Sequence, residues 1–533
     1  MGFAHDYATA IVRRGRYPME PADWVPDWAD RPRKGKHFPA ADAFPLPADP
    51  APDPAATVQR GLHGPEGTGS FTLPLLAAML RDSYGLVGRR LAVQANSDLG
   101  TLPMYTQANW SRGTASGGGL YPVGVHWVTG PGGPLTPGVH YYDTRHHELR
   151  RLLVGDVTPE VRAAVGEPAR GHRQFLVLGV RFWQNAFKYN SFAYHVVTMD
   201  TGALLQTWRL WARAHGLPLG PVLWFDEPRL GRLLGLTPEE EGVFAVVPLR
   251  WEADRPEEPG TGEAPAAGRE AVRVRHRDQE RSSRVVAFGT VTAMHAATLE
   301  GAAERPAPQA LAKVLAEPAD PGGERTPLPP AEPLHAAVRD ALRARRSSFG
   351  RFQAALPLPA AGLSTVLAAA DAAGSLGSDT ETPGAAPLTR LYVFVNHVAA
   401  VDQGVYLYDR ADRSLRLLRA GAPGAFLQRN YFLANYNLEQ AAAVIVPAAR
   451  THAVLDAVGD RGYRLVNAVV GGISQAVYTA CAAAGLACGV ALGFDAVSYT
   501  EELGLAETGE IPLLTMMIGH EGPRPADFRH EIV

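Results

Sequence analysis

The chain has 533 residues, 46% of them apolar, which is enough for roughly two to four ordinary domains with a large buried core. Its 51 Lys and Arg nearly balance its 54 Asp and Glu, so no overall field would draw it onto nucleic acid or an anionic membrane. The first residues lack the order of a secretory signal, and Cys481 and Cys488 have no neighbours at metal-ligand spacing. We therefore expect a cytoplasmic protein with no metal site and no nucleic-acid or membrane partner.

Composition divides the chain into four regions. Residues 1–55 are expected to form an N-terminal extension and residues 56–252 a first half. Residues 253–333 are rich in Glu, Pro, Gly and Arg, which is typical of a solvated linker, although a short stretch at 284–299 looks ordered. Residues 334–533 are expected to form a second half.

Each half is predicted to hold two apolar strands, a long helix and a closing strand. In the first half the strands lie at 126–128 and 175–180, and the helix runs from about Ser191 to His215. The second half has the same order, with strands at 391–395 and 442–447 and a helix from about Tyr463 to Ala484. Strands mixed with long helices favour an α+β layer structure.

The run from Leu465 to Phe494 carries no formal charge and is long enough to span a membrane. Polar side chains and five glycines interrupt it, and no aromatic belt flanks it. We expect this run to form a buried core helix followed, after Gly485, by a short strand.

An internal repeat relates the two halves. Phe225-Asp226, Leu234-Gly235-Leu236 and Glu241 recur 269 residues later with the same spacings, as Phe494-Asp495, Leu503-Gly504-Leu505 and Glu510. Two homologous halves in one chain are therefore predicted.

Two motifs have the chemistry of a binding site for a flat ring and a phosphate. The glycines of Ser116-Gly117-Gly118-Gly119 would let the backbone approach a ring or phosphate closely, although a plain turn before a strand explains the same residues. In the second half, Arg345-Arg346-Ser347 and Arg351 offer donors suited to a phosphate, although a solvated basic helix end is the alternative.

Together with the paired endings, these motifs resemble the nitroreductase superfamily, and most closely its azoline dehydrogenases, which act on thiazole- and oxazole-modified peptides. Residues 14–39 resemble the N-terminal region of members from thiopeptide clusters. The resemblance implies two tandem nitroreductase-like halves that form an intramolecular pseudo-dimer, with FMN held between them. Gly493, directly before the second Phe-Asp pair, is assigned to the FMN site on the same basis.

Only one complete FMN site is expected. The glycine motif of the first half aligns with the segment 381–387, where Glu381 and Pro383 replace Ser and Gly. The paired arginines of the second half align near residues 58–61, which lack them. If each site takes one motif from each half, a single FMN per chain follows.

The family carries an adjacent Lys-Tyr pair before its long helix, and Lys188 and Tyr189 match this pair, whereas the second half has Ala457 and Val458. The resemblance assigns a catalytic role to Lys188 and Tyr189. Asn190 stands where the family has a glycine, and the pair is expected on a loop that leads into the helix, with Asn190 or Ser191 as the N-cap. The alternative is that Lys188 pairs with a carboxylate or with the flavin phosphate.

The expected function is an FMN-dependent dehydrogenase that oxidises azolines of a ribosomally made precursor peptide to azoles. In this reaction a base removes a ring proton while a hydride leaves the adjacent carbon, and a lysine in an aromatic pocket can serve as the base because burial lowers the pKa of an amine. The expected partners are the azoline-containing peptide and cyclodehydratase proteins. Two alternatives remain open, a nitro or quinone reductase that uses NAD(P)H and a flavin-free scaffold for a cyclase.

Overall fold

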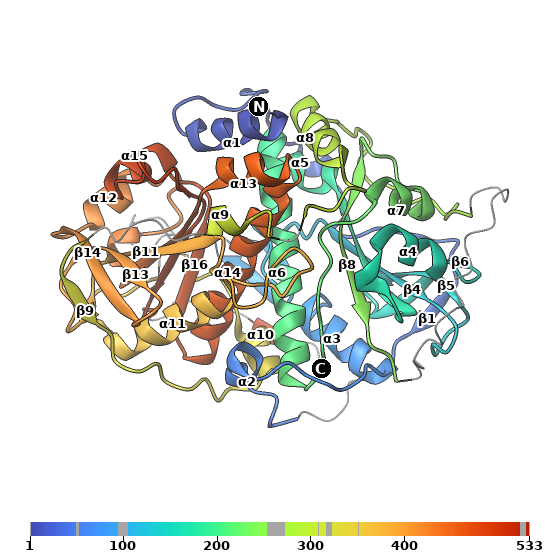
Figure 1. The fold of residues 1–533 in the computed structure, drawn as a ribbon, viewed down its shortest axis with the longest axis horizontal. Helices are drawn as coiled ribbons and strands as arrows, with labels where there is room; N and C mark the ends of the chain where they lie inside the picture. The colour runs from blue at the N-terminus through green and yellow to red at the C-terminus, as the bar shows by residue number, and fades with distance from the viewer. Residues whose placement is uncertain are drawn as a thin grey trace.

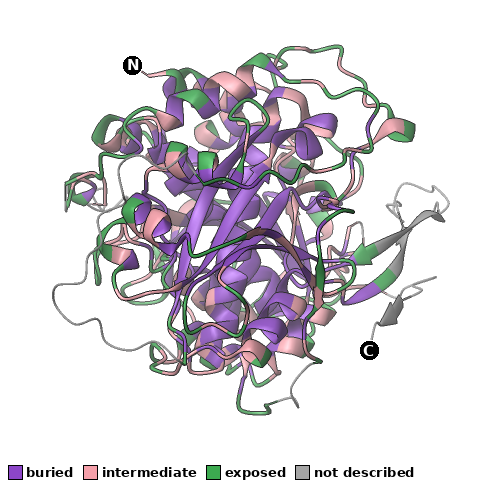
Figure 2. Ribbon diagram, turned by 90° about the vertical axis from the view of Figure 1, so that its right-hand side faces the viewer, coloured by how far each residue is buried: buried purple, intermediate pink, exposed green. Residues whose placement is uncertain are grey.

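A computed structural model describes residues 2–48, 53–93, 105–252, 272–307, 309–315, 322–349, 351–522 and 529–531, with the side chains of 90–93, 105–109 and 529–531 left aside. Figure 1 shows two sheets, one at each side of the molecule, with two long helices packed together between them. Buried residues follow these helices and the strands beside them, as the purple segments in Figure 2 show.

Each half is built on an antiparallel sheet. The first sheet has the order β1, β6, β5, β4, β7, β8, with the bounds Ala43–Pro45, Glu148–Val154, Gly138–Asp143, Val123–Thr129, Gln174–Arg181 and Glu241–Leu249. The second has the order β16, β18, β15, β11, β13, β14, β9, with the bounds Ala487–Ala491, Thr515–Gly519, Ala443–Ala449, Thr389–Val395, Gly404–Asp409, Ser414–Ala420 and Arg325–Pro327, and β17 (Ile511–Pro512) also pairs with β15. Three of the four predicted strands lie within β4, β7 and β11, and the fourth, predicted at 442–447, begins one residue before β15.

The predicted long helices are confirmed to within two residues at each end, as α6 (Ala193–Ala214) and α14 (Gly462–Ala483). Helix α14 is apolar and long enough to cross a membrane, but 94% of its apolar window is buried inside the protein. It is the core helix that the sequence predicts.

The two helices meet backbone to backbone at a pair of glycines. A Cβ added at Gly202 would fall 1.9 Å from the carbonyl oxygen of Ala468, and one added at Gly471 would fall 2.0 Å from that of Met199. Each residue of one pair lies 269 positions from its counterpart in the other pair, which is the offset of the sequence repeat. The helix crossing therefore lies on a two-fold pseudo-symmetry axis.

Shorter helices repeat this symmetry. Val58 donates its N–H to the carbonyl of Ala336, and Val338 donates to the carbonyl of Ala56, so the chain enters α2 (Val58–His63) and α10 (Val338–Ala344) through one reciprocal bridge. Before the long helices, α5 (Phe182–Tyr189) matches α13 (Thr451–Val458) at the same offset. The tandem, two-half α+β arrangement is thus confirmed.

Residues between the halves are more ordered than their composition predicts. The stretch predicted as ordered contains α8 (Gly289–Leu299), and β9 adds a strand to the second sheet. Upstream of α8, Asp278 pairs with Arg181, and Trp183 donates its indole N–H to Ser282 Oγ at 3.0 Å. Asp278, Glu280 and Ser282 thus find partners in the first half, although most residues from 272 to 283 are exposed and lie in no helix or strand.

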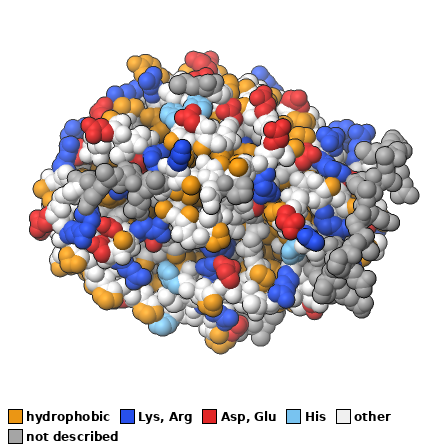
Figure 3. All heavy atoms as spheres, viewed as in Figure 1, with side chains coloured by type: hydrophobic (Ala, Val, Ile, Leu, Met, Phe, Trp, Pro, Cys, Tyr) orange, Lys and Arg blue, Asp and Glu red, His pale blue; other side chains and the backbone are white. Residues whose placement is uncertain are grey.

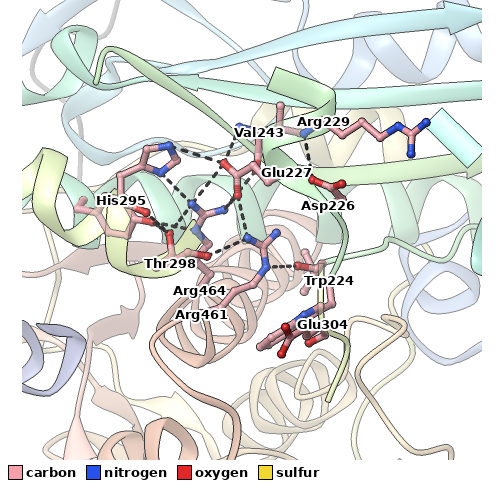
Figure 4. Close-up of polar contacts among 12 residues, drawn as sticks. Trp224, Asp226, Glu227, Arg229, Val243, His295, Thr298, Glu304, Arg461 and Arg464 are labelled. Carbon is pink, nitrogen blue, oxygen red and sulfur yellow. Dashed lines mark hydrogen bonds and ion pairs between the residues drawn. The ribbon is translucent and has the colours of Figure 1, made fainter. Parts of the chain in front are cut away.

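A buried ion-pair cluster joins α8 to both halves (Figure 4). Glu227, at the start of α7 (Glu227–Leu234), accepts hydrogen bonds from Arg461 at 2.8 Å and from Arg464 at 2.7 Å, and Arg464 also donates to Thr298 Oγ1 of α8 at 2.7 Å. Burial alone would raise the pKa of Glu227, but the charges of Arg464 and Arg461 outweigh burial and lower the pKa to about 2. Since removing one partner would strand a buried charge, this cluster holds the halves and α8 in one arrangement.

Gly202→Ala is expected to destabilise the protein. The added methyl group has no room at the helix crossing, and overpacking of this kind typically costs about 1 to 3 kcal/mol. Urea unfolding followed by tryptophan fluorescence would measure the loss. Gly231→Ala in α7 is the matched control, because its Cβ meets nothing within 4 Å, and it should be neutral or slightly stabilising. Equal stability of the two variants would contradict a close helix crossing.

Candidate active site between the halves

The glycine motif forms a tight loop that a buried carboxylate holds in place. Gly118 and Gly119 have φ angles of 62° and 65°, a region that favours glycine. Asp200 of α6 accepts a hydrogen bond from Ser116 Oγ at 2.6 Å and another from the backbone N–H of Gly117 at 2.8 Å. Burial raises the pKa of Asp200 to about 7, because the two hydrogen bonds only partly offset the loss of solvation.

The second half forms hydrogen bonds with the same loop. Gln475 of α14 accepts a hydrogen bond from the N–H of Ala115 at 2.9 Å and donates to the carbonyl of Gly113 at 3.2 Å. Because Asp200 and Gln475 lie on the two crossing helices, the conformation of the loop depends on both halves.

Lys188 and Tyr189 converge on this loop. A Cβ at Gly118 would lie 2.5 Å from the Tyr189 hydroxyl and 2.8 Å from Lys188 Nζ, so a side chain at this position would force both groups to move. Both residues are half-buried. The structure therefore brings together the two motifs of the first half, which are 69 residues apart at Gly119 and Lys188.

The prediction that the pair lies on a loop is wrong. Lys188 and Tyr189 form the last turn of α5, and neither Asn190 nor Ser191 caps α6. Asn190 ends α5 instead, with φ at 41° and ψ at −130°. This is a conformation that glycine adopts readily, so Asn190 reproduces the backbone that a glycine would give at this position.

The arginine motif of the second half lies beside the loop, with its donors engaged. Arg345 is buried and donates to the carbonyls of Gly113 at 2.8 Å and Arg112 at 3.1 Å. Arg346 forms an ion pair with Glu521, and Ser347 Oγ lies 2.7 Å from the hydroxyl of Tyr478. Arg345 thus joins the two halves through hydrogen bonds. The sequence does not reveal this role, because the acceptors are backbone groups 232 and 233 residues away.

The remaining predicted residues lie at the edge of this arrangement. Arg351 accepts a backbone hydrogen bond from Gly522 at 2.6 Å, next to the bridge between Phe352 and Glu521. Gly493 contacts the loop at 431–433 and accepts a hydrogen bond from the N–H of Phe432 at 2.8 Å. No described contact joins Gly493 to the glycine loop or to Lys188.

Two cations near Lys188 escape sequence analysis. The Arg112 guanidinium is buried between the rings of Tyr84 and Tyr121, 4.6 and 4.2 Å from their centroids, and donates to the carbonyl of Lys34 at 2.9 Å. Desolvation of its amine and the charges of Arg112, Arg31 and Lys188 lower the pKa of Lys34 to about 8, although the residue as a whole is exposed. Within the described part of the chain, no carboxylate pairs with Lys34, Arg112 or Lys188.

The pseudo-symmetric position in the second half is built differently. Ala457 and Val458 end α13 where Lys188 and Tyr189 end α5, and Val469 takes the place of Asp200. Helix α1 (Phe3–Arg13) lies against α13, where His5 Nε2 is 2.9 Å from a carboxylate oxygen of Asp456 (Figure 1). This position therefore lacks the groups that surround Gly118.

Comparisons with known proteins agree on the fold. Residues 342–520 match the model of the nitroreductase family. A protein described as a nitroreductase from Anabaena variabilis matches 98% of this chain and 100% of its own, with a TM-score of 0.71 and 21% identity. The search of curated proteins found no match.

Two further solved structures match smaller parts. A protein described as a nitroreductase from Ralstonia eutropha is 23% identical over 40% of this chain and 90% of its own, with a TM-score of 0.27. A chain of the E. coli microcin synthetase McbBCD complex with truncated pro-MccB17 bound is 20% identical over 28% of this chain and 57% of its own, with a TM-score of 0.24. Residues 342–520 thus match the nitroreductase family, and the chain as a whole shares the fold of the protein from Anabaena variabilis.

Asp200→Asn is expected to change how stability depends on pH. Because the pKa of Asp200 is raised in the folded protein, the fold binds this proton more tightly than the unfolded chain does. The contribution of protonated Asp200 to the free energy of unfolding is fully present below about pH 4. It is lost as the pH rises to about 7, and the loss is up to about 4 kcal/mol. Asn has no proton to lose, so the free energy of unfolding of the variant should rise relative to that of the wild type as the pH increases over this range. Urea unfolding at several pH values would measure the difference, and a gap that does not change with pH would contradict the assignment.

Proposed function

We propose that this protein is an FMN-dependent dehydrogenase that oxidises azolines in a ribosomally made peptide to azoles. The observation that carries the proposal is the convergence of Lys188 and Tyr189 on Gly118, in a loop that both halves hold by hydrogen bonds. Simple reduction of a nitro group or a quinone needs no base placed for a C–H proton, whereas removal of the azoline Cα proton does. The pair therefore favours the dehydrogenase over a reductase that uses NAD(P)H.

The residues around the loop fit a flat anionic group such as FMN. Space is open at Gly119, where an added Cβ meets nothing within 4 Å. Lys34 and Arg112 provide positive charge that no described carboxylate neutralises. In this proposal Ser116 and the three glycines line the flavin, while Arg345, Arg346, Ser347 and Arg351 close the site from the second half. When bound, FMN supplies a two-electron acceptor.

The protein groups handle the protons. Oxidation of an azoline removes one proton and one hydride, which together carry two electrons and two protons. Lys188 Nζ, as the neutral amine, accepts the proton from the ring Cα, and the hydride would leave the adjacent carbon for the two-electron acceptor. The hydroxyl of Tyr189 shares the space above Gly118 with Lys188 Nζ and passes that proton toward solvent. Phe187 and Trp183, both buried, form the apolar wall behind the pair. The expected partners are the precursor peptide and the cyclodehydratase proteins that form its azolines.

Purified protein should contain FMN at close to one molecule per chain. Only the first half places a Lys-Tyr pair at the end of its short helix, and α1 lies against the corresponding helix of the second half. Flavin released on denaturation, measured by absorbance against protein concentration, tests this number. A ratio near two would contradict the single site, and the absence of flavin would favour a scaffold without redox activity.

Lys188→Ala should leave FMN bound and the fold intact but reduce azole formation from an azoline peptide by about a hundred- to ten-thousand-fold, the usual effect of losing a general base. Tyr189→Phe keeps the ring and removes only the hydroxyl, so it separates proton transfer from packing. Val458→Ala, at the position equivalent to Tyr189, is the control and should retain activity. If Lys188→Ala loses flavin in proportion to activity, the lysine binds the cofactor and the assigned role is wrong.

A further inference from the structure

A small cavity lies where α1, α6, α13 and α14 meet the start of α15 (Ala496–Glu502), in the upper part of Figure 1. Its empty space of about 380 Å³ includes solvent at its mouth, so only a small ligand can fit inside. Most of its wall is apolar, and the polar residues that line it are Arg14, His195, Thr451 and Tyr463.

Arg14, directly after α1, brings a charge into this cavity. Its guanidinium lies 4.1 Å from the centre of the Phe192 ring, and no hydrogen bond or ion pair joins it to any residue that the structure describes. Burial lowers the pKa of Arg14 only to about 10, so the side chain stays charged at neutral pH. Burial and this charge lower the pKa of His195 to about 3, so His195 is neutral. The cavity therefore holds a cation without a counter-ion.

The internal repeat identifies the equivalent place in the first half. There Arg464 donates to the hydroxyl of Tyr194 at 2.8 Å. In the cavity, His195 Nδ1 lies 2.7 Å from the hydroxyl of Tyr463. Each member of one pair lies 269 residues from its counterpart in the other pair, which is the offset of the repeat. The cavity thus corresponds to the buried ion-pair cluster of Figure 4.

The two places differ by one carboxylate. Glu227, the first residue of α7, carries the carboxylate at the centre of the cluster, and its counterpart is Ala496, the first residue of α15. Both helices follow a capping aspartate, Asp226 or Asp495, so their backbones begin in the same way. Ala496 lines the cavity. Because alanine ends at Cβ, the outer part of a glutamate side chain, which has the size of acetate, is missing beside Arg14.

We propose that this cavity binds a small monocarboxylate the size of acetate, which takes the place that the Glu227 carboxylate holds in the first half. Arg14 supplies charge-assisted hydrogen bonds, and the apolar wall contacts the methyl group. Thr451 offers a further donor, because its hydroxyl has no partner among the described residues although only 1% of the residue is exposed.

The attraction for the ligand comes from Arg14 itself. On the face that Figure 3 shows, charges of both signs are interspersed, so no patch of one sign on that face draws anions. A bound carboxylate would connect α1 to the helices around it, as Glu227 connects α7 to α14 in the first half. The site does not depend on FMN or on the proposed reaction.

Saturation-transfer NMR on the full chain, observing the methyl group of acetate at neutral pH and constant ionic strength, tests the proposal. Acetate should bind the wild type saturably, and acetamide, which has the same shape without the charge, should bind at least about tenfold more weakly. Arg14→Gln should weaken acetate binding by a similar factor. This variant should keep its fold, because the cation that it removes has no ion-pair partner in the described part of the chain.

Ala496→Glu should abolish acetate binding, since it supplies the missing carboxylate from the chain itself. Arg13→Gln is the matched control, because Arg13 is exposed, precedes Arg14 and does not line the cavity, and it should bind acetate as the wild type does. No saturable binding by the wild type, equal binding of acetamide, or unchanged binding in Arg14→Gln would overturn the proposal. Displacement of acetate by inorganic phosphate would show a general anion site and would also overturn it. Flavin content should be the same in all these variants.

Discussion

The contact between α6 and α14 at Gly202 and Gly471 is the constraint on which the rest of the structure depends. With no side chain at either glycine, the two backbones touch, and the neighbouring turns of both helices come within reach of one loop. Asp200 lies two residues before Gly202, and Gln475 lies four residues after Gly471, so each helix supplies one polar group to residues 113–117. A wider crossing would separate these two groups, and the loop would then be held from one side only.

The same crossing creates two equivalent positions, and the residues at these two positions differ. Near the first, Asp200 fixes a glycine loop and α5 ends in Lys188 and Tyr189. Near the second, Val469 cannot hold a loop, and α1 packs on α13. The outer surfaces also differ, because Arg181 forms ion pairs with Asp278 and Glu280, whereas Arg450 at the equivalent position donates to the carbonyl of Val314.

Sequence alone predicts those parts of this structure that produce a periodic pattern of apolar residues or a repeated spacing of motifs. The repeat, the two long helices and their flanking strands follow from patterns that local sequence preserves. The helical position of Lys188 was missed because Asn190 and Ser191 look like an N-cap, whereas tertiary packing continues α5 to Tyr189 and bends the chain at Asn190. Asp200, Arg112 and Lys34 carry no motif, since their importance arises only from residues far away in the chain.

The charged groups near the glycine loop have different partners in the two halves. Arg345 directs its donors to backbone carbonyls of the first half, and Arg346 is balanced by Glu521, so the arginine motif contributes mainly to joining the halves. On the first-half side, Arg112 lies between two tyrosine rings and Lys34 approaches it, with no described carboxylate nearby to neutralise either. Since a buried cation without a counter-ion is unfavourable, an anionic group bound at the loop would stabilise the fold that binds it.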